Sequence, residues 1–318
     1  MNSILFLGYS NVFKTRILPI LSRLDIQKVS IAKYYLQEWD DAPANIEQPV
    51  TLYDTYEQAF SDFSGNLVYI TTVNSTHYQY ARQALLQGFN VIVDKPITLA
   101  FEESCDLLDI ARSKGLLICE STVYLDHPQM KLVSDIFKEN GENPKLITAH
   151  FTLPPFQENN FRYKQELGGG AIADTASYAV SLGRYFFKEP PLKVACTIHE
   201  RNDEVELQYS LLMSYPNGKC LIGHFGFTTE YVNQILVMGN RLNVSLNRVF
   251  TITEDMENNL TVSKMNSTEM VKAPKGNTFQ LFLTRVLEKF NNQCFEEFYQ
   301  DLEYDSLVRK MIINTISQ

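Results

Sequence analysis

The sequence predicts an α/β protein, in which a doubly wound parallel sheet is followed by a second α/β domain with a large, mostly antiparallel open sheet. Three observations support this prediction. In the first third of the 318 residues, short apolar runs alternate with helical patterns. After about residue 120 the runs are strand-like and separated by turn signals, and from residue 278 the spacing is helical again.

The first third reads as strand, helix, strand in repetition. We expect strands at 4–7, 29–32, 67–70, 91–93 and 116–118, and helices at 17–21, 80–87 and 101–114. Strands that alternate with helices pair in parallel through right-handed crossovers, which gives a doubly wound sheet. The strands are continuous apolar runs, so both faces of this sheet are expected to be buried.

The second part of the chain reads mainly as strands. They are expected at 145–151, 194–197, 204–214, 219–228, 234–239, 242–246 and 249–253. Turn signals such as Pro216-Asn217-Gly218 separate neighbouring strands, which predicts a largely antiparallel sheet. We expect one domain at 1–120 and a second at 121–318, with the helices from about residue 278 as candidates for packing back on the first.

Composition excludes two classes of function. A net charge of -9 and the lack of a basic stretch interleaved with aromatic residues argue against nucleic-acid binding. No apolar run reaches the roughly 18 residues of a membrane span, and the first residues lead straight into a strand pattern without a secretion signal. We therefore expect a cytoplasmic protein.

The cysteines and histidines do not indicate a metal centre. The five cysteines are widely spaced and form no Cys-x-x-Cys pair, so we expect buried thiols. No two of the five histidines lie three to five residues apart, as zinc ligands on one element usually do. We expect no dedicated metal site.

The turn after the first strand reads Gly8-Tyr9-Ser10-Asn11-Val12-Phe13, which keeps only the first glycine of a Gly-x-Gly-x-x-Gly fingerprint. Backbone N–H groups at the start of the next helix could hold a pyrophosphate without help from side chains. Alternatively, Ser10 and Asn11 simply cap that helix.

Lys33 follows the second strand, where an NAD enzyme usually carries an acidic residue that binds the ribose hydroxyls. A lysine attracts the 2′-phosphate of NADP, whereas a carboxylate repels it. The sequence therefore favours NADP(H) over NAD(H), unless Lys33 is a solvated surface lysine.

Asp94-Lys95-Pro96 stands where the apolar run 91–93 stops. Open α/β sheets bind their ligands at the carboxyl ends of strands, which makes Lys95 a candidate for chemistry. The structural alternative is a strand cap followed by a proline turn.

A second cluster follows three consecutive glycines, Gly168-Gly169-Gly170, which permit a close approach of backbone to ligand. Asp174 and Tyr178 are four residues apart on the predicted helix and share one face. A phenol near an ammonium group is a good general acid or base, because the cation stabilises the phenolate. Without Lys95, a first-turn dipole partner and a core aromatic would be the simpler interpretation.

These residues carry a resemblance. A strand, Asp-Lys-Pro, and then Gly-Gly-Gly-x-x-x-Asp-x-x-x-Tyr resembles the Gfo/Idh/MocA family of nicotinamide-dependent oxidoreductases, whose usual form is Glu-Lys-Pro and Gly-Gly-Gly-x-x-x-Asp-x-Gly-x-His or Tyr. The resemblance covers nearly the whole chain. The segments 127–129, 161–163, 239–244 and 248–251 are most similar to the branch that reduces the 3-keto group of nucleotide-linked deoxysugars.

The resemblance implies a Rossmann-like dinucleotide-binding domain, a substrate-binding and oligomerisation domain, and a cofactor between them. It implies that Lys95 reaches the nicotinamide ribose and the reacting oxygen, that Tyr178 donates the proton, and that Asp174 orients the sugar. The predicted cofactor-binding residues are Gly8, Ser10, Asn11, Val12, Phe13, Lys33, Thr72, Asn74, His77, Asp94, Lys95 and Pro96. The predicted substrate-binding residues are Arg162, Tyr163, Asp174 and Tyr178. Family members are commonly oligomeric through the open face of the sheet, which implies a homodimer or homotetramer.

Three features depart from the family pattern. Asp94 is one methylene shorter than the usual glutamate, Ala176 replaces the common glycine, and the first loop is poor in glycine. None of them removes a reacting group.

The sequence therefore predicts an NADP-dependent oxidoreductase that transfers a hydride between nicotinamide and a sugar, with C3 of a nucleoside-diphosphate keto-deoxyhexose as the expected position. One alternative is a dehydrogenase of a free sugar or cyclitol. Another is a catalytically silent NADP-binding sensor or scaffold protein.

Overall fold

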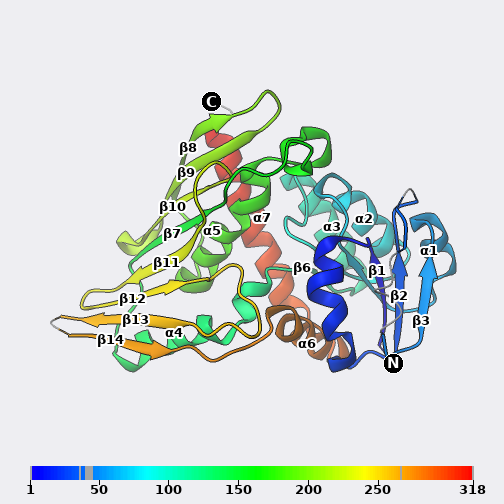
Figure 1. The fold of residues 1–318 in the computed structure, drawn as a ribbon, viewed down its shortest axis with the longest axis horizontal. Coiled ribbons are helices and arrows are strands. Elements are labelled where there is room, and N and C mark those ends of the chain that lie inside the picture. The colour runs from blue at the N-terminus through cyan, green and yellow to red at the C-terminus, as the bar shows by residue number, and fades with distance from the viewer. Residues whose placement is uncertain (1, 36, 40–45, 266, 317–318) are drawn as a thin grey trace. The chain divides into compact units, whose positions relative to one another are not determined.

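The computed structural model describes residues 2–35, 37–39, 46–265 and 267–316 (Figure 1). The chain divides into two compact units. The first contains the residues up to Ser121 and Phe279–Glu303, and the second contains Thr122–Thr278 and the residues from Tyr304.

The first unit is built on a six-stranded sheet with the order β3-β2-β1-β4-β5-β6. Every neighbouring pair in it is parallel. This confirms the doubly wound sheet that the alternation of strands and helices predicted. The strands are β1 (Ser3–Leu7), β2 (Lys28–Ala32), β3 (Val50–Tyr53), β4 (Leu67–Ile70), β5 (Asn90–Val93) and β6 (Ile118–Glu120).

The sequence missed β3, because this strand lies at the edge of the sheet and is only partly buried. The helices of this unit are α1 (Tyr56–Asp62), α2 (His77–Leu86), α3 (Phe101–Lys114), α6 (Thr278–Asn291) and the short η1 (Phe13–Ile17), η2 (Leu18–Arg23) and η4 (Asn74–Thr76). The predicted helix at 17–21 is a π-helical turn that continues into a 3₁₀ helix with Pro19 in its first turn. Proline suits a first turn, because its missing N–H has no partner there.

The carboxyl-terminal helices contribute to this unit. Tyr299 and Leu302, near the start of α7 (Glu296–Ile316), belong to the hydrophobic core under the parallel sheet. The Tyr299 hydroxyl donates a hydrogen bond to the Leu116 carbonyl at 2.6 Å. Residues of α7 from Tyr304 onward count with the second unit.

The second unit is built on an eight-stranded sheet with the order β14-β13-β12-β11-β7-β10-β9-β8. Its pairs are antiparallel except for β7 and β10, which confirms the large, mostly antiparallel sheet. The strands are β7 (Leu146–Thr152), β8 (Lys193–Arg201), β9 (Glu206–Ser214), β10 (Cys220–Gly226), β11 (Val232–Met238), β12 (Leu242–Asn247), β13 (Asn259–Lys264) and β14 (Ser267–Lys272).

The strand predicted at 249–253 is wrong. Val249 and Phe250 donate their backbone N–H groups to the Asn233 side-chain oxygen at 2.9 and 3.0 Å, so a side chain replaces a neighbouring strand. The sequence also missed β13 and β14, and β14 is almost wholly exposed at the sheet edge. An exposed strand of mixed polar residues lacks the apolar alternation that identifies a half-buried one.

One face of this sheet is covered by α5 (Ala171–Phe187), a nearly all-buried helix that packs on β9 and β10. On β9 and β10, the paired residues Leu212 and Ile222 are exposed, so this part of the other face is open. The remaining helices are α4 (Pro128–Glu139), η5 (Val123–Asp126), η6 (Phe161–Tyr163), η7 (Gln165–Leu167) and η8 (Pro216–Gly218).

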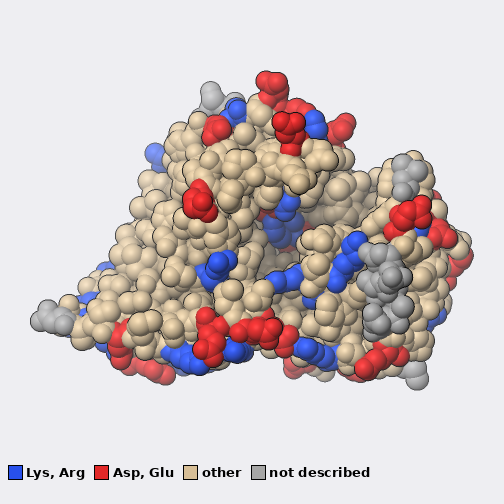
Figure 2. Space-filling model, in the orientation of Figure 1, with Lys and Arg blue, Asp and Glu red and all other residues tan. Residues whose placement is uncertain are grey.

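The surface carries charges of both signs. On the face drawn in Figure 2, acidic and basic side chains occur in small groups with uncharged residues between them. Within the described residues, no helix has both the length and the hydropathy that a membrane crossing requires. Cys119 is buried, Cys294 is exposed and the other three cysteines are half-buried, so the expectation of five buried thiols is wrong.

His127 caps α4 from a buried position. Its Nδ1 accepts the Gln129 backbone N–H at 3.2 Å, and the residue is 1% exposed. Burial lowers the pKa of His127 to about 4, against about 6.5 in an unfolded chain. Because only the unfolded state binds the proton easily, this contribution to stability is complete above pH 6.5 and is lost as the pH falls towards 4.

We predict that His127→Asn, which keeps an acceptor for the cap, weakens the acid sensitivity of the protein. Between pH 7 and pH 4.5, the free energy of unfolding should fall by about 2 kcal/mol less in this variant than in the wild type. Urea titrations at the two pH values measure the difference. Equal losses in both proteins would show that His127 does not contribute to acid sensitivity.

Candidate active site

Lys95 lies at the carboxyl end of β5, as predicted, and is half-buried. The turn that follows is tied down, since the Ile97 backbone N–H donates to Glu120 Oε2 at 2.7 Å. Glu120 ends β6, the neighbouring parallel strand. The lysine therefore projects from a turn that the sheet itself fixes.

His77 supports this turn. Its ring is fully buried, with Nδ1 2.8 Å from the Pro96 carbonyl oxygen and Nε2 3.0 Å from the Thr72 carbonyl oxygen. The ring links the loop after β4 to the segment that carries Lys95. In this structure His77 positions the loop, and its direct contact with a cofactor stays a prediction, as does that of the buried Asn74.

Asp94 is held by two hydroxyl groups that no sequence motif singled out. Ser121 donates to its Oδ1 at 2.6 Å, and Tyr69 donates to the same oxygen at 3.3 Å. Burial raises the pKa of the Asp94 carboxyl, while the Ser121 hydrogen bond and the charges of His77 and Lys95 act in the opposite direction. The shorter acid therefore links the ends of three neighbouring strands.

The turn after β1 approaches the loop after β4 closely. Gly8 has φ +119°, and a Cβ built on it would lie 2.8 Å from the Thr71 carbonyl oxygen, so both conformation and space require glycine. Ser10 Oγ accepts the Phe13 N–H at 3.1 Å and caps the helix start. Asn11 and Val12 are exposed there, whereas the Phe13 side chain is buried. An exposed helix start of this kind is compatible with a pyrophosphate.

Lys33 is not the solvated surface lysine of the alternative interpretation. It is 6% exposed, and its Nζ lies 3.3 Å from Asp54 Oδ1. A cation at the end of β2 has the charge that a 2′-phosphate requires, which fits NADP at this position, although Asp54 pairs with it.

The three glycines fold the chain back on itself before α5. Gly169 and Gly170 donate their N–H groups to the carbonyl oxygens of Lys164 and Arg162, each at 2.9 Å. A Cβ on Gly169 would lie 2.5 Å from the Arg162 oxygen. The space that glycine leaves is thus taken by the chain's own backbone, where the sequence suggested room for a ligand.

This fold-back joins two of the predicted substrate-binding residues. Arg162 Nε donates to Asp174 Oδ2 at 2.9 Å, and the guanidinium stacks over the rings of Phe156 and Phe161. Asp174 is buried in the first turn of α5. The Tyr163 hydroxyl accepts the Phe156 backbone N–H at 2.8 Å within its own loop, so a substrate contact of Tyr163 stays a prediction.

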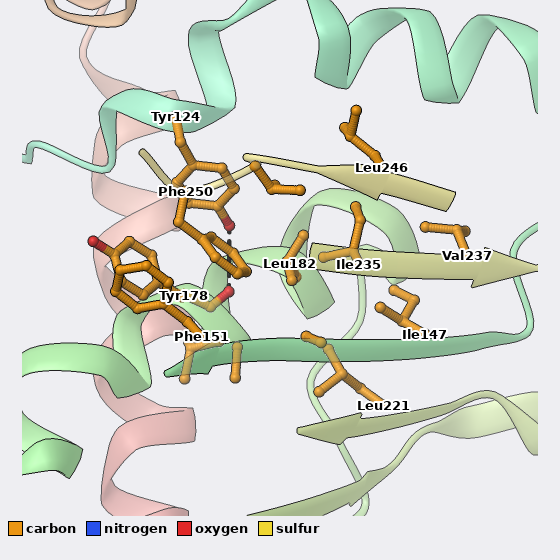
Figure 3. Packing of buried hydrophobic residues seen from close by; sticks show 14 of the residues in the cluster. Tyr124, Ile147, Phe151, Tyr178, Leu182, Leu221, Ile235, Val237, Leu246 and Phe250 are labelled. Atoms are coloured by element: carbon orange, nitrogen blue, oxygen red, sulfur yellow. Dashed lines mark hydrogen bonds between the residues drawn. The ribbon is translucent and has the colours of Figure 1, made fainter. Parts of the chain in front are cut away.

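Tyr178 lies one turn further along α5 and is 8% exposed. Its ring packs against Phe250, Phe151 and Tyr124, with centroid distances of 4.6, 5.0 and 5.8 Å. In Figure 3 the Tyr178 hydroxyl lies at the edge of this cluster, on the side away from Leu182. The ring is therefore fixed by packing, while the hydroxyl is at the boundary of the core.

Supporting residues of Tyr178 were not evident in the sequence. Tyr124 donates to the Tyr178 carbonyl oxygen at 3.3 Å (Figure 3), and Asn233 holds the segment that carries Phe250.

Within the described part of the chain, no group of three or more histidine, cysteine or acidic residues could hold a metal ion.

Comparison with known proteins assigns both parts of the chain to one family. Residues 3–121 match the sequence model described as "Oxidoreductase family, NAD-binding Rossmann fold". Residues 142–245 match the model of the GFO/IDH/MocA C-terminal domain.

Two curated relatives have different substrates. The chain is 29% identical over 211 residues to a dTDP-3,4-didehydro-2,6-dideoxy-alpha-D-glucose 3-reductase of Streptomyces antibioticus, and this match covers 65% of the chain and 64% of the relative. It is 28% identical over 169 residues to D-xylose 1-dehydrogenase (NADP(+)) 2 of Haloferax volcanii, which covers 53% of the chain and 52% of that relative. The chain thus spans less than two thirds of either protein.

A solved structure shares the whole fold. KijD10, a 3-ketoreductase from Actinomadura kijaniata in complex with NADP and TDP-benzene, superimposes with a TM-score of 0.88 at 22% identity, covering 99% of this chain and 97% of its own. At this identity the likeness concerns the fold alone. The two sequence models show that the chain belongs to the Gfo/Idh/MocA family of oxidoreductases.

Proposed function

We propose that this protein is an NADP-dependent oxidoreductase that reduces C3 of a nucleoside-diphosphate keto-deoxyhexose. The observation that carries the proposal is the arrangement on α5, where Asp174 is fixed by Arg162 one turn before Tyr178. The names of the 3-reductase relative and of the structural neighbour support this substrate class.

The nicotinamide, when bound, supplies the hydride. Tyr178 donates a proton to the oxygen of the reacting carbonyl group, which removes the negative charge that the hydride would leave on it. Lys95 stabilises that developing charge as a fixed cation. The Asp174 carboxylate accepts a hydrogen bond from a sugar hydroxyl, and Arg162 fixes the direction in which it does so.

The residues of the first unit are proposed to hold the cofactor. The exposed start of the helix after β1 binds the pyrophosphate, and Lys33 binds the 2′-phosphate of NADP. The proposed location is the cytoplasm, because the proposed reaction uses NADPH and a nucleotide sugar.

We further propose that the protein is a homo-oligomer through the open face of the eight-stranded sheet. The exposed pair Leu212 and Ile222 on the neighbouring strands β9 and β10 supports this, because exposed large apolar side chains on a sheet face favour a partner surface. Light scattering is expected to give at least twice the 36.5 kDa mass of the chain. A monomer at micromolar concentration would contradict the proposal.

A second candidate is the oxidation of a free sugar, which the similarity to D-xylose 1-dehydrogenase favours. Fluorescence titration with NADPH and NADH, followed by a screen of nucleotide-linked keto sugars, free sugars and cyclitols, separates the candidates. We expect tighter binding of NADPH and turnover of a nucleotide-linked 3-keto sugar. Turnover of free sugars alone would establish the second candidate, and cofactor binding without any turnover would indicate a sensor.

A further inference from the structure

A carboxylate, Asp54, lies beside Lys33 just after the end of the neighbouring strand β3. β2 and β3 pair in parallel with Ala32 opposite Tyr53, and the Lys33 backbone N–H donates to the Tyr53 carbonyl oxygen at 3.2 Å. The next residue, Asp54, therefore emerges beside Lys33 at the same edge of the sheet. Its carboxylate lies 3.3 Å from Lys33 Nζ, yet 73% of its side chain is exposed.

Trp39 completes this cluster. Its indole N–H donates to the same Asp54 oxygen at 2.8 Å, and Lys33 Nζ lies 5.7 Å from the centre of its ring. The Trp39 hydrogen bond and Lys33 lower the pKa of the Asp54 carboxyl, which is therefore ionised at neutral pH.

The cluster adjoins the turn after β1. Trp39 packs edge-on against Tyr9 with a centroid distance of 4.9 Å, and the Gln37 side chain donates to the Tyr9 carbonyl oxygen at 2.6 Å. Tyr9 precedes the capping residue Ser10. Lys33 and Asp54 thus belong to the edge of the sheet where the adenosine end of a dinucleotide is expected.

We propose that Asp54 is a specificity-determining residue that limits the preference of this chain for NADP over NAD. The inference rests on the proposed function, in which Lys33 receives the 2′-phosphate. In the observed arrangement Lys33 is already neutralised by Asp54, and an incoming 2′-phosphate meets a carboxylate as well as an ammonium group. A ribose hydroxyl, by contrast, can donate a hydrogen bond to that carboxylate, as it does to the acidic residue that NAD enzymes carry at the end of the second strand.

The substitution Asp54→Asn separates the effect of the carboxylate charge from that of the side-chain shape. Asparagine has nearly the same shape and keeps an oxygen that accepts the Trp39 N–H, but it neither neutralises Lys33 nor repels a phosphate. Because Asp54 is exposed and therefore partly screened, we expect a change of about tenfold rather than several hundredfold.

Binding of 2′,5′-ADP and 5′-AMP tests the inference without catalysis, and calorimetry measures both. Asp54→Asn should bind 2′,5′-ADP about tenfold more tightly, while the affinity for 5′-AMP changes less than threefold. The gain should shrink in 0.5 M NaCl, because salt screens exposed charges. The emission of Trp39, the single tryptophan of the chain, reports whether the cluster stays folded.

Asp109→Asn is the matched control, because it removes the same charge from an exposed position on α3. If both substitutions change the affinity for 2′,5′-ADP equally, the change follows from the net charge of the protein alone, and the role of Asp54 is overturned. Unchanged or weaker binding of 2′,5′-ADP by Asp54→Asn would also overturn it, and would show instead that Asp54 orients Lys33. A wild-type protein that binds neither nucleotide would contradict the proposed function itself.

Discussion

Tyr178→Phe is expected to lower the turnover number by about 100-fold or more, the usual loss when a general acid is removed. The substitution deletes only the hydroxyl, and the ring keeps its contacts with Phe250 and Phe151. The fold and the affinity for NADPH should therefore change little. Steady-state kinetics with saturating NADPH measure turnover, and fluorescence titration measures cofactor binding.

Lys95→Ala should cause a loss of similar size, because the cation that stabilises the developing oxyanion is gone. Tyr185→Phe is a suitable control, since it also removes a tyrosine hydroxyl from α5. That hydroxyl accepts a hydrogen bond from Ser134 Oγ at 3.3 Å. It should leave turnover within twofold of the wild type. Near-normal turnover in both Lys95→Ala and Tyr178→Phe would refute the assigned roles.

The fold was largely predictable because its strongest signals are local. The strands of the parallel sheet are buried on both faces and read as apolar runs, and most strands of the second sheet are bounded by turn residues. The errors arise where contacts between residues far apart in the sequence determine the local backbone conformation. The segment 249–253 has the composition of a strand, but the Asn233 side chain takes its backbone N–H groups.

The residues of the candidate site could be predicted from the sequence, but the contacts between them could not. Lys95, Asp174 and Tyr178 were identified from motif spacing and from the family resemblance. The sequence named His77 and Arg162 only as candidate ligand contacts, whereas in the structure His77 contacts the Pro96 carbonyl in the Lys95 turn and Arg162 pairs with Asp174. The pairing of Lys33 with Asp54 depends on the register of two parallel strands, which a single sequence does not specify.

The largest effect on stability is expected at a buried ion pair in the second unit. Arg184 on α5 and Asp305 on α7 form two hydrogen bonds, with Nε to Oδ1 at 2.8 Å and Nη2 to Oδ2 at 3.0 Å. Their side chains are only 14% and 5% exposed. Asp305→Ala removes this carboxylate from a guanidinium that is still buried, which costs about 3–5 kcal/mol in comparable cases.

Urea unfolding followed by circular dichroism measures that loss, and Asp135→Ala provides its control. Asp135 pairs with Lys131 on α4, where both side chains are exposed, so its removal should cost less than about 1 kcal/mol. The double variant Arg184→Met, Asp305→Leu should regain much of the stability that Asp305→Ala loses, because replacing both ions leaves no charge buried. Equal losses for Asp305→Ala and Asp135→Ala would contradict a large contribution of the buried pair to stability.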